Sequence, residues 1–480
     1  MQEILDKILA KYLSTEAETI QKAYTFAETA HIGQKRDSGE DYITHPIAVA
    51  QILADFNMDH ETISAGLLHD VLEDTKTKLE TLEKEFGANI SFLVQSVTKL
   101  HRVNYSGESS SAKASEGQRN YIENFHKMIL ATAKDIRVVL IKLADRLHNL
   151  ETLATFKGNK EKIAREALEV YAPLASRLGM GEVKGLMEDY AFPYVYPEEY
   201  INLLDFVENQ IAENKKYTEK IKPAVEKILK ENNIRYIRLS ARAKHLYSLW
   251  RKLQKYDFDL ERMYDLVALR VIVPDIVSCY ETLGILHKYW QPLPNRIKDF
   301  IALPKPNGYQ SLHTTVFCEE GKITEFQIRT DEMSKNADYG IAAHWSYKES
   351  KSPLAKKYSW LKQLAEWQQQ NLTSEDFWEN AKIDFFKDRI FLYTPKGDVI
   401  ELPEEATPLD FAYAVHSDIG DKCIQAKVNG KIMAITHSLN DGDIVEIVTA
   451  KNQRPSRDWL KFIKTSKART KIKERLRLVS

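Results

Sequence analysis

The sequence predicts a multidomain α+β protein in which a helical half precedes a mixed half. Apolar residues recur at helical spacing from residue 1 to about residue 200. Segments with the composition of buried strands begin near Asp265, and short strands separated by glycine turns fill residues 389–449. The chain has 480 residues, which is long enough for roughly three or four domains with separate cores.

The composition excludes several classes of protein. The formal net charge is −1, so any affinity for nucleic acid must come from local patches. The three cysteines are widely separated, which argues against a disulfide framework or a cysteine zinc site. The N-terminus is charged, with no apolar signal segment, and no apolar run approaches the roughly 20 residues that span a bilayer. We therefore expect a cytoplasmic protein without a membrane partner.

The elements of the helical half can be placed from local signals. Pro46 sits in the first turn of a helix predicted over residues 47–56. Residues 136–144 are apolar on nearly every face, which predicts a buried helix. The small, polar residues 102–118 predict a mobile loop, and residues 200–232 are typical of connecting helices.

Strands are predicted in the second half, followed by a tryptophan-rich helical stretch from Trp345 to Trp378 and by a basic helical tail over residues 451–480. The strands expected before that stretch cover residues 265–273, 314–317 and 324–328.

A set of potential metal ligands lies in residues 65–75. His69 and Asp70 are adjacent, and Glu73 and Asp74 follow one helical turn later, so these side chains can share a helix face. Polar groups among leucines are costly to bury, and a divalent cation would remove that cost. A bare His-Asp pair is a weak signal, however, and the alternative is a surface pair without metal.

Two residues elsewhere strengthen the metal interpretation. His45, at a helix start, can supply a second imidazole, and Asp145, which interrupts an apolar helix, can supply a second carboxylate; Asn149 lies one turn beyond Asp145. Two imidazoles and two carboxylates suit Mn²⁺, Fe²⁺ or Zn²⁺ better than Ca²⁺. A metal-bound water is a nucleophile for phosphorus, and Glu73 or Asp74 can take its proton.

A second constellation is basic. Residues 232–256 contain seven Lys or Arg residues and no acidic residue, which is more often a solvated helix than a site. Here Asp265 follows at the start of an apolar strand and Glu325 lies on a later one, a usual way to hold Mg²⁺ against phosphates. The seven basic residues are Arg235, Arg238, Arg242, Lys244, Arg251, Lys252 and Lys255.

Residues 296–313 combine cations with a Pro-Asn-Gly turn and with Tyr309 and His313. This set suits a nucleotide, with charges for phosphates and a ring to stack on a base. A basic surface turn is an equally good interpretation from this stretch alone. The three cations are Arg296, Lys298 and Lys305.

Taken together, the motifs resemble the long RelA/SpoT homologues, which make and degrade the guanosine tetra- and pentaphosphate alarmones of the stringent response. The resemblance covers nearly all of the chain. Its motifs are the stretch 296–313 and the segments Ala144–Asn149, Tyr171–Ala175, Ala243–Ser248, Ile341–Trp345, Thr394–Gly397 and Asp410–Tyr413.

The resemblance implies five regions. They are an all-α HD hydrolase domain (1–199), connecting helices (200–235), a nucleotidyltransferase-like α/β synthetase domain (236–380), a small β-grasp TGS domain (386–450) and the basic helical tail (451–480).

For the hydrolase, the resemblance implies removal of the 3′-pyrophosphate of ppGpp or pppGpp, giving GDP or GTP and pyrophosphate. Glu73 and Asp74 would activate water, Arg36 would hold the guanine and Asn149 the ribose. The implied Mn²⁺ ligands are His45, His69, Asp70 and Asp145.

For the synthetase, the resemblance implies transfer of pyrophosphate from ATP to the 3′-hydroxyl of GDP or GTP. Asp265 and Glu325 would hold Mg²⁺, Glu325 or Gln327 would assist the hydroxyl, and Tyr309 would stack on the guanine. Asn307 and His313 would belong to the guanine loop. The implied phosphate ligands are Arg242, Lys244, Lys252, Arg296, Lys298 and Lys305.

The Arg-x-Lys-Asp sequence at residues 296–299 is similar to that of bifunctional members, which keep both activities. Four positions depart from the family pattern: Asp41, Ser176, Ser334 and Asp338. Because Ser334 and Asp338 flank the synthetase site, one alternative is a hydrolase whose weak synthetase domain senses nucleotides.

A further alternative is a module that binds the ribosome or tRNA and whose catalysis is incidental. The tail has eleven Lys or Arg residues against two acids, so it is either a solvated helix or an RNA contact. By resemblance, the TGS domain can touch the 3′ end of uncharged tRNA, with His416 at the implicated position. Long family members continue into regulatory domains, so we expect weak ribosome sensing by these residues.

Overall fold

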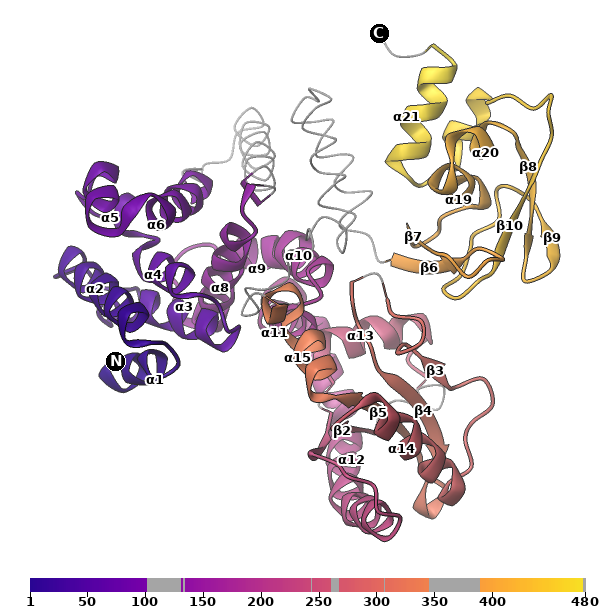
Figure 1. Ribbon diagram of the computed structural model, residues 1–480, viewed down its shortest axis with the longest axis horizontal. Coiled ribbons are helices and arrows are strands. Elements are labelled where there is room, and N and C mark those ends of the chain that lie inside the picture. The colour runs from indigo at the N-terminus through magenta and orange to yellow at the C-terminus, as the bar shows by residue number, and fades with distance from the viewer. Residues whose placement is uncertain are drawn as a thin grey trace. The chain divides into compact units, whose positions relative to one another are not determined.

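The computed structural model describes residues 1–101, 131–132, 134–242, 244–259, 267–305, 307–344 and 389–477 (Figure 1). It divides into two compact units, the first formed by residues 1–107 and 127–362 and the second by residues 108–126 and 363–480. The predicted loop over 102–118, the tryptophan-rich stretch and Asp265 lie outside the described residues. No helix in the described ranges is both long and apolar enough to cross a bilayer.

The described part of residues 1–195 is helical, which confirms the prediction. Helix α4 packs against α2, α3, α6 and α8, so it lies at the centre of this bundle. The helices are α1 (Gln2–Leu9), α2 (Ser14–Ala30), α3 (Thr44–Asp55), α4 (His60–Leu68), α5 (Val71–Asp74), α6 (Leu79–His101), α8 (Arg137–Glu151), α9 (Lys160–Glu166), α10 (Ala172–Arg177) and α11 (Gly181–Val195). The 3₁₀ turn Leu153–Thr155 and the π-helical turn Ala167–Tyr171 complete the list.

Two of these helices confirm specific predictions. Helix α3 begins three residues earlier than predicted, with Pro46 in its first turn, where the missing N–H has no helical partner to lose. Helix α8 contains the predicted buried run and is buried from Val138 to Asp145. Two charged side chains, Lys142 and Asp145, are therefore enclosed among apolar residues, and they must pair to be tolerated there.

Residues 197–231 form one continuous helix, α12 (Pro197–Glu231), and not separate connecting helices. An apolar stripe explains its role, because Tyr217, Ile221, Val225 and Leu229 recur at helical spacing and are buried. They pack in one core cluster with the apolar face of the following sheet. Helix α12 is thus part of the next domain's core as well as a connection.

A five-stranded mixed sheet follows, in the order β1-β2-β5-β4-β3, with β2 and β5 parallel and the other neighbours antiparallel. The predicted strands at 314–317 and 324–328 are confirmed within β4 and β5. The strands are β1 (Arg238–Ala241), β2 (Ala268–Val273), β3 (Lys298–Asp299), β4 (Leu312–Phe317) and β5 (Ile323–Thr330), and the helices are α13 (Leu246–Lys255), α14 (Ile276–Tyr289) and α15 (Asp331–Tyr339).

The two faces of this sheet differ in polarity. Phe326 and Ile328 of β5 point to the apolar core that α12 and α14 share. Since side chains alternate along a strand, Glu325, Gln327 and Arg329 point to the opposite face. That polar face carries Glu325 and Gln327, which the sequence analysis expects in the synthetase site.

Two glycines allow the helical domain and the synthetase domain to approach closely within the first unit. Gly340 has φ +56°, and a Cβ there would lie 2.0 Å from the Leu178 carbonyl oxygen. A Cβ on Gly179, whose φ is +75°, would lie 2.9 Å from the carbonyl oxygen of Asn307, in the stretch 296–313. Both positions therefore require glycine, and they bring the segment after α10 against this stretch.

The second unit contains the predicted β-rich module. A two-stranded sheet pairs β6 with β7, and a three-stranded antiparallel sheet has the order β10-β8-β9. The elements are β6 (Arg389–Tyr393), β7 (Val399–Pro403), α19 (Pro408–Val415), α20 (Ser417–Asp421), β8 (Cys423–Val428), β9 (Lys431–Met433), β10 (Val445–Thr449) and α21 (Ser466–Arg475), with a 3₁₀ turn at Arg457–Lys461.

The basic tail is docked on this module and is not a free, solvated helix. Ala468 and Ile472 of α21 are buried in one cluster with Leu409 and Tyr413 of α19. The carboxylate of Asp410, fully buried, accepts hydrogen bonds from the backbone N–H groups of residues 464 and 465. The helical prediction for the tail holds for Ser466–Arg475, but its apolar side belongs to the core of the second unit.

Candidate active sites

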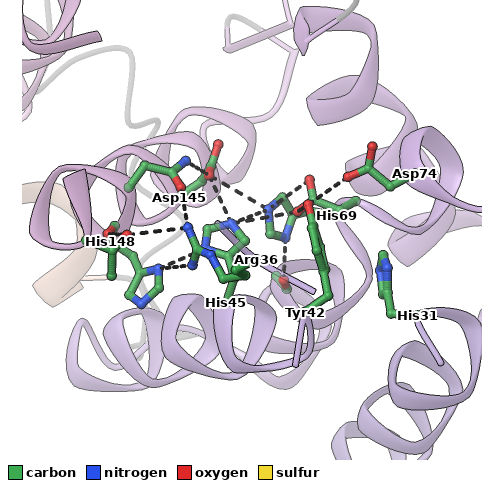
Figure 2. Close-up of polar contacts among 12 residues, drawn as sticks. His31, Arg36, Tyr42, His45, His69, Asp74, Asp145 and His148 are labelled. Atoms are coloured by element: carbon green, nitrogen blue, oxygen red, sulfur yellow. Dashed lines mark hydrogen bonds and ion pairs between the residues drawn. The ribbon is translucent and has the colours of Figure 1, made fainter. Parts of the chain in front are cut away.

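The four predicted metal ligands of the helical domain converge (Figure 2). Nε2 of His45 lies 3.2 Å from Nε2 of His69 and 3.2 Å from Oδ1 of Asp145. Nε2 of His69 lies 3.1 Å from Oδ1 of Asp70. All four side chains are buried, and His45, His69 and Asp70 have donor atoms spaced to hold one ion.

Local structure explains how three separate segments reach this point. His45 is in the first turn of α3, and Asp145 is on the buried helix α8. A Cβ at Gly66 would lie 2.6 Å from Cδ1 of Leu53, so this glycine lets α4 approach α3. The Gly66 carbonyl also accepts a hydrogen bond from Nδ1 of His69 at 2.7 Å, which leaves the Nε2 lone pair facing the cluster.

The expectation that residues 69–74 share one unbroken helix is wrong. Helix α4 ends at Leu68 and the short α5 begins at Val71, so His69 and Asp70 lie at the junction. The backbone stays right-handed there, and Asp74 N still bonds the Asp70 carbonyl at 2.9 Å. The junction lets His69 and Asp70 both point inward, which two consecutive residues of a regular helix do less well.

The electrostatics of the cluster suit a divalent cation. Burial lowers the pKa of His45, which keeps its imidazole neutral and able to coordinate. Burial alone would raise the pKa of Asp145, but the Lys142 ammonium, 2.8 Å from its Oδ2, holds that pKa well below its usual range. Two carboxylates and two imidazole lone pairs facing one another therefore fit a bound divalent cation.

Tyr42 is a site residue that the sequence interpretation missed. Its hydroxyl lies 2.9 Å from Oδ2 of Asp70 and 2.6 Å from Oδ2 of Asp74, so it connects a metal-ligand candidate to a candidate base. Tyr42 lies in the turn before α3, three residues before His45, and its nearness to His45 in the sequence was the available signal. Glu73, the other predicted base, is half-buried on α5.

The two residues expected to hold the nucleoside are brought together. Nη2 of Arg36 donates to Oδ1 of Asn149 at 3.2 Å and to Oγ1 of Thr152 at 3.3 Å. Nδ2 of Asn149 in turn donates to Oδ1 of Asp145 at 2.7 Å. The predicted substrate residues therefore border the predicted metal cluster.

The synthetase candidates gather on the polar face of the sheet. Oε1 of Glu325 lies 3.0 Å from Nδ1 of His313, and Oε2 lies 3.8 Å from Nη1 of Arg242. The Tyr309 hydroxyl lies 2.8 Å from Nε2 of His313. Burial lowers the pKa of His313, so the neutral ring can donate from Nδ1 to Glu325 and accept from Tyr309 at Nε2. Gln327, also buried, lies beside His313 in the paired strands.

The loop over 296–313 folds back on this face. Lys298 pairs with His313 in the sheet, and Nζ of Lys305 lies 5.7 Å from the centre of the Tyr309 ring. The turn closes through the Gly308 N–H to the Lys305 carbonyl at 2.8 Å, with Asn307 inside it. The structure brings these loop residues together but leaves Arg296 and Lys298 exposed. Lys244 precedes α13 and Lys252 lies on it, both half-buried.

Three family models match the chain: an HD domain over residues 23–181, a region found in RelA/SpoT proteins over 241–352 and a TGS domain over 390–449. A guanosine-3′,5′-bis(diphosphate) 3′-pyrophosphohydrolase of Aquifex aeolicus is 46% identical over 99% of the chain and 67% of that protein. The chain belongs to the RelA/SpoT family. The resemblance drawn from the motifs is thereby confirmed.

Other RelA/SpoT relatives carry both kinds of name. A bifunctional (p)ppGpp synthase/hydrolase SpoT of Escherichia coli K12 is 43% identical over 99% of the chain and 67% of that protein. A GTP pyrophosphokinase of Myxococcus xanthus is 46% identical over 95% of the chain and 60% of that protein. The chain thus spans about three fifths to two thirds of these relatives. The matched regions lie within the predicted HD, synthetase and TGS domains.

Two arginines of this RelA/SpoT sheet were also missed. Arg270 of β2 and the buried Arg329 of β5 share the carboxylate of Asp338, at 3.7 Å and 3.5 Å from Oδ1. Ser334 donates to the other oxygen of Asp338 at 3.3 Å. The sequence signal that could have identified them is a charged residue within each of two otherwise apolar strands. The two departures from the family pattern, Ser334 and Asp338, thus contact each other. Asp338 also contacts the two arginines on the polar face of the sheet.

His245 joins the synthetase helix α13 to α11 of the hydrolase region. Its Nδ1 lies 2.8 Å from Oδ2 of Asp189, and its Nε2 lies 3.9 Å from Oε2 of Glu182. The hydrogen bond to Asp189, followed by the longer contact with the Glu182 carboxylate, raises the pKa of His245 to about 9. A Cβ on Gly185 would lie 2.2 Å from the His245 ring, so the two helices are in close contact.

This pair predicts a pH-dependent stability. The unfolded-state pKa of His245 is about 6.5, so its stabilisation is fully present below pH 6.5 and is lost as the pH rises through 9. We expect a loss of about 1–3 kcal/mol of unfolding free energy across that window. Denaturant unfolding followed by circular dichroism across this pH range measures it. His245→Gln should flatten the profile, and an unchanged profile would contradict the role of this pair.

Proposed function

We propose that the chain is a bifunctional alarmone enzyme. It hydrolyses the 3′-pyrophosphate of ppGpp or pppGpp to GDP or GTP plus pyrophosphate, and it transfers pyrophosphate from ATP to the 3′-hydroxyl of GDP or GTP. The observation that carries the proposal is the buried set of His45, His69, Asp70 and Asp145 in a chain that also keeps the Glu325–His313 site. Relatives bearing hydrolase, synthetase and bifunctional names support it.

In the hydrolase half, His45, His69, Asp70 and Asp145 would hold Mn²⁺. When bound, the cation would lower the pKa of a coordinated water and so supply a nucleophile near neutral pH. Glu73 and Asp74 would accept the proton of that water, and the Tyr42 hydroxyl holds the Asp74 carboxylate. Arg36 and Asn149 hold the guanine and ribose, which directs the 3′ side of the nucleotide to the cluster.

In the synthetase half, Asp265 and Glu325 would hold Mg²⁺, which neutralises phosphate charge during transfer. The 3′-oxygen of the acceptor forms a bond to the β-phosphorus of ATP, the bond from that phosphorus to the α,β-bridging oxygen breaks, and AMP leaves. Glu325 or Gln327 assists the hydroxyl, Glu325 by taking its proton and Gln327 by accepting a hydrogen bond from it. Tyr309 stacks on the acceptor guanine, within the loop that holds Asn307 and His313. The cations Arg242, Lys244, Lys252, Arg296, Lys298 and Lys305 bind phosphates.

The proposal is tested with two reactions of the unmodified chain. ATP and GDP with Mg²⁺ should yield the tetraphosphate and AMP, and the tetraphosphate with Mn²⁺ should yield GDP and pyrophosphate. Hydrolysis without synthesis would favour a hydrolase whose synthetase domain serves as a nucleotide sensor. That second candidate is motivated by the 3.5–3.7 Å contacts of Asp338 with its two arginines, which are long for charge-assisted hydrogen bonds.

The second unit would contribute contacts to uncharged tRNA or the ribosome. His416 is exposed and its Nδ1 accepts a hydrogen bond from Asp418 N at 3.2 Å, as the N-cap of α20. The exposed basic side of α21 adds positive charge. Filter binding of uncharged tRNA at two salt concentrations tests this, since phosphate contacts weaken steeply with salt. We further propose that the enzyme acts in the cytoplasm.

A further inference from the structure

His148 lies between the metal-ligand cluster and the residues that hold the nucleoside, and the proposed function gives it no role. Its Nδ1 is 2.8 Å from Nδ1 of His45 and 3.1 Å from Nη1 of Arg36 (Figure 2). One nitrogen atom of one side chain thus contacts both a metal-ligand candidate and a substrate-binding candidate.

The chemistry of Arg36, His148 and His45 determines which ring nitrogen of each histidine carries the proton. A guanidinium group only donates hydrogen bonds, so Nδ1 of His148 accepts from Arg36 and the ring proton of His148 is on Nε2. The same Nδ1 has no proton to give to His45. Nδ1 of His45 must therefore carry a proton and donate, which leaves the lone pair of His45 on Nε2. That atom faces His69 and Asp145, where a cation would bind.

We propose that His148 is a positioning residue that fixes the metal-binding tautomer of His45 and, through the same atom, the position of Arg36. The inference rests on the proposed function, because it requires a cation at the cluster. Histidine ligands usually donate their second N–H to a group that sets their tautomer and orientation, and loss of that group weakens metal binding. Here that group is a histidine whose own tautomer is set by the substrate-binding arginine.

A second path closes the network. Arg36 also donates to Asn149, and Asn149 donates to Asp145. Asp145, His148 and Asn149 lie three and four residues apart on α8, so one face of one helix presents them together. Arg36 is therefore connected to two ligand candidates by hydrogen bonds. Loss of His148 should change metal affinity and nucleotide affinity together.

The first measurement is the Mn²⁺ dissociation constant of the metal-free full chain, by isothermal titration calorimetry without nucleotide. His148→Phe keeps a ring but removes the acceptor, and we expect about 10–100-fold weaker Mn²⁺ binding. His148→Asn places an oxygen acceptor near the position of Nδ1 and should keep most of the affinity. His60→Phe, at the start of α4 and outside the cluster, is the matched control and should bind as the parent does.

The second measurement separates the effect of His148 on His45 from its effect on Arg36. At saturating Mn²⁺, kcat of His148→Phe for tetraphosphate hydrolysis should recover toward the parent value, whereas KM should stay raised because Arg36 has lost a partner. GDP binding to the metal-free chain, measured in a Tyr309→Ala background that weakens the synthetase acceptor site, should also weaken when His148→Phe is added. If His148→Phe does not fold, as judged by circular dichroism, His148→Ala takes its place.

Unchanged Mn²⁺ affinity in the Phe variant would overturn the proposal. Equal losses of Mn²⁺ affinity in the Phe and Asn variants would also overturn it, because the hydrogen-bond acceptor at residue 148 would then not determine metal binding. A parent chain that binds no Mn²⁺ would refute the metal centre of the proposed function. In that case, GDP binding by the metal-free chain in the Tyr309→Ala background, with and without His148→Phe, still decides the Arg36 connection: equal affinities would overturn it.

Discussion

Asp145→Ala is expected to abolish hydrolysis and to destabilise the helical domain by about 3–5 kcal/mol, because it leaves a buried charge without its partner. The Lys142 side chain is 2% exposed, and its Nζ lies 2.8 Å from Oδ2 of Asp145. The change removes a metal-ligand candidate and strands this ammonium in an apolar helix. Hydrogen exchange of α8 peptides measures the local loss of stability.

The double variant Lys142→Met with Asp145→Ala separates the two effects. Without the buried cation, protection of α8 should recover toward the parent level, whereas Mn²⁺ binding and hydrolysis should remain lost. Recovery of hydrolysis together with stability would show that Asp145 only balances the charge of Lys142. Full protection of α8 in the single Asp145→Ala variant would contradict the importance of the pair.

Glu325→Gln is expected to lower the synthesis rate by about 10²–10⁴-fold while hydrolysis stays near the parent rate. Glutamine keeps the shape of the side chain and an oxygen that can accept a hydrogen bond from Nδ1 of His313. In the parent chain this nitrogen lies 3.0 Å from Oε1 of Glu325. The loss therefore reports on the negative charge, which the proposal uses for Mg²⁺ or for the hydroxyl proton. Initial rates of AMP release from ATP and GDP measure it.

Glu320→Gln is the matched control for this variant. Glu320 is exposed, in the 3₁₀ turn Glu319–Gly321, and pairs with Lys220 at the surface. Exposed pairs of this kind contribute little, about 0–1 kcal/mol, so synthesis by Glu320→Gln should equal that of the parent. A Glu325→Gln variant with similar activity would mean that the carboxylate is not part of the synthetase chemistry.

The sequence predicted those features that depend on periodicity and residue type. Helical spacing indicated the first domain, and the charged Asp145 within an apolar run marked a residue that needs a partner. Strand composition located β4 and β5. The set of His45, His69, Asp70 and Asp145 was found because each member is unusual in its own local context, and the fold then brings the four together.

The features that were missed depend on tertiary contacts. The break between α4 and α5 falls at His69 and Asp70, where no glycine or proline marks it in the sequence. His148 acquires its role only when Arg36, 112 residues earlier in the chain, reaches α8. The basic composition of the tail predicted a solvated helix or an RNA contact, yet Ala468 and Ile472 pack in one buried cluster with α19. A narrow apolar stripe of this kind is easily missed in a helix whose composition is mostly hydrophilic.

We propose that one chain carries two opposing reactions at separate sites, and paired variants test this most directly. Asp70→Ala and Glu325→Gln are each assayed for tetraphosphate formation from ATP and GDP and for tetraphosphate hydrolysis with Mn²⁺. Asp70→Ala should form and accumulate tetraphosphate without degrading it, and Glu325→Gln should degrade it without forming it. Loss of both activities from either single change would contradict the account.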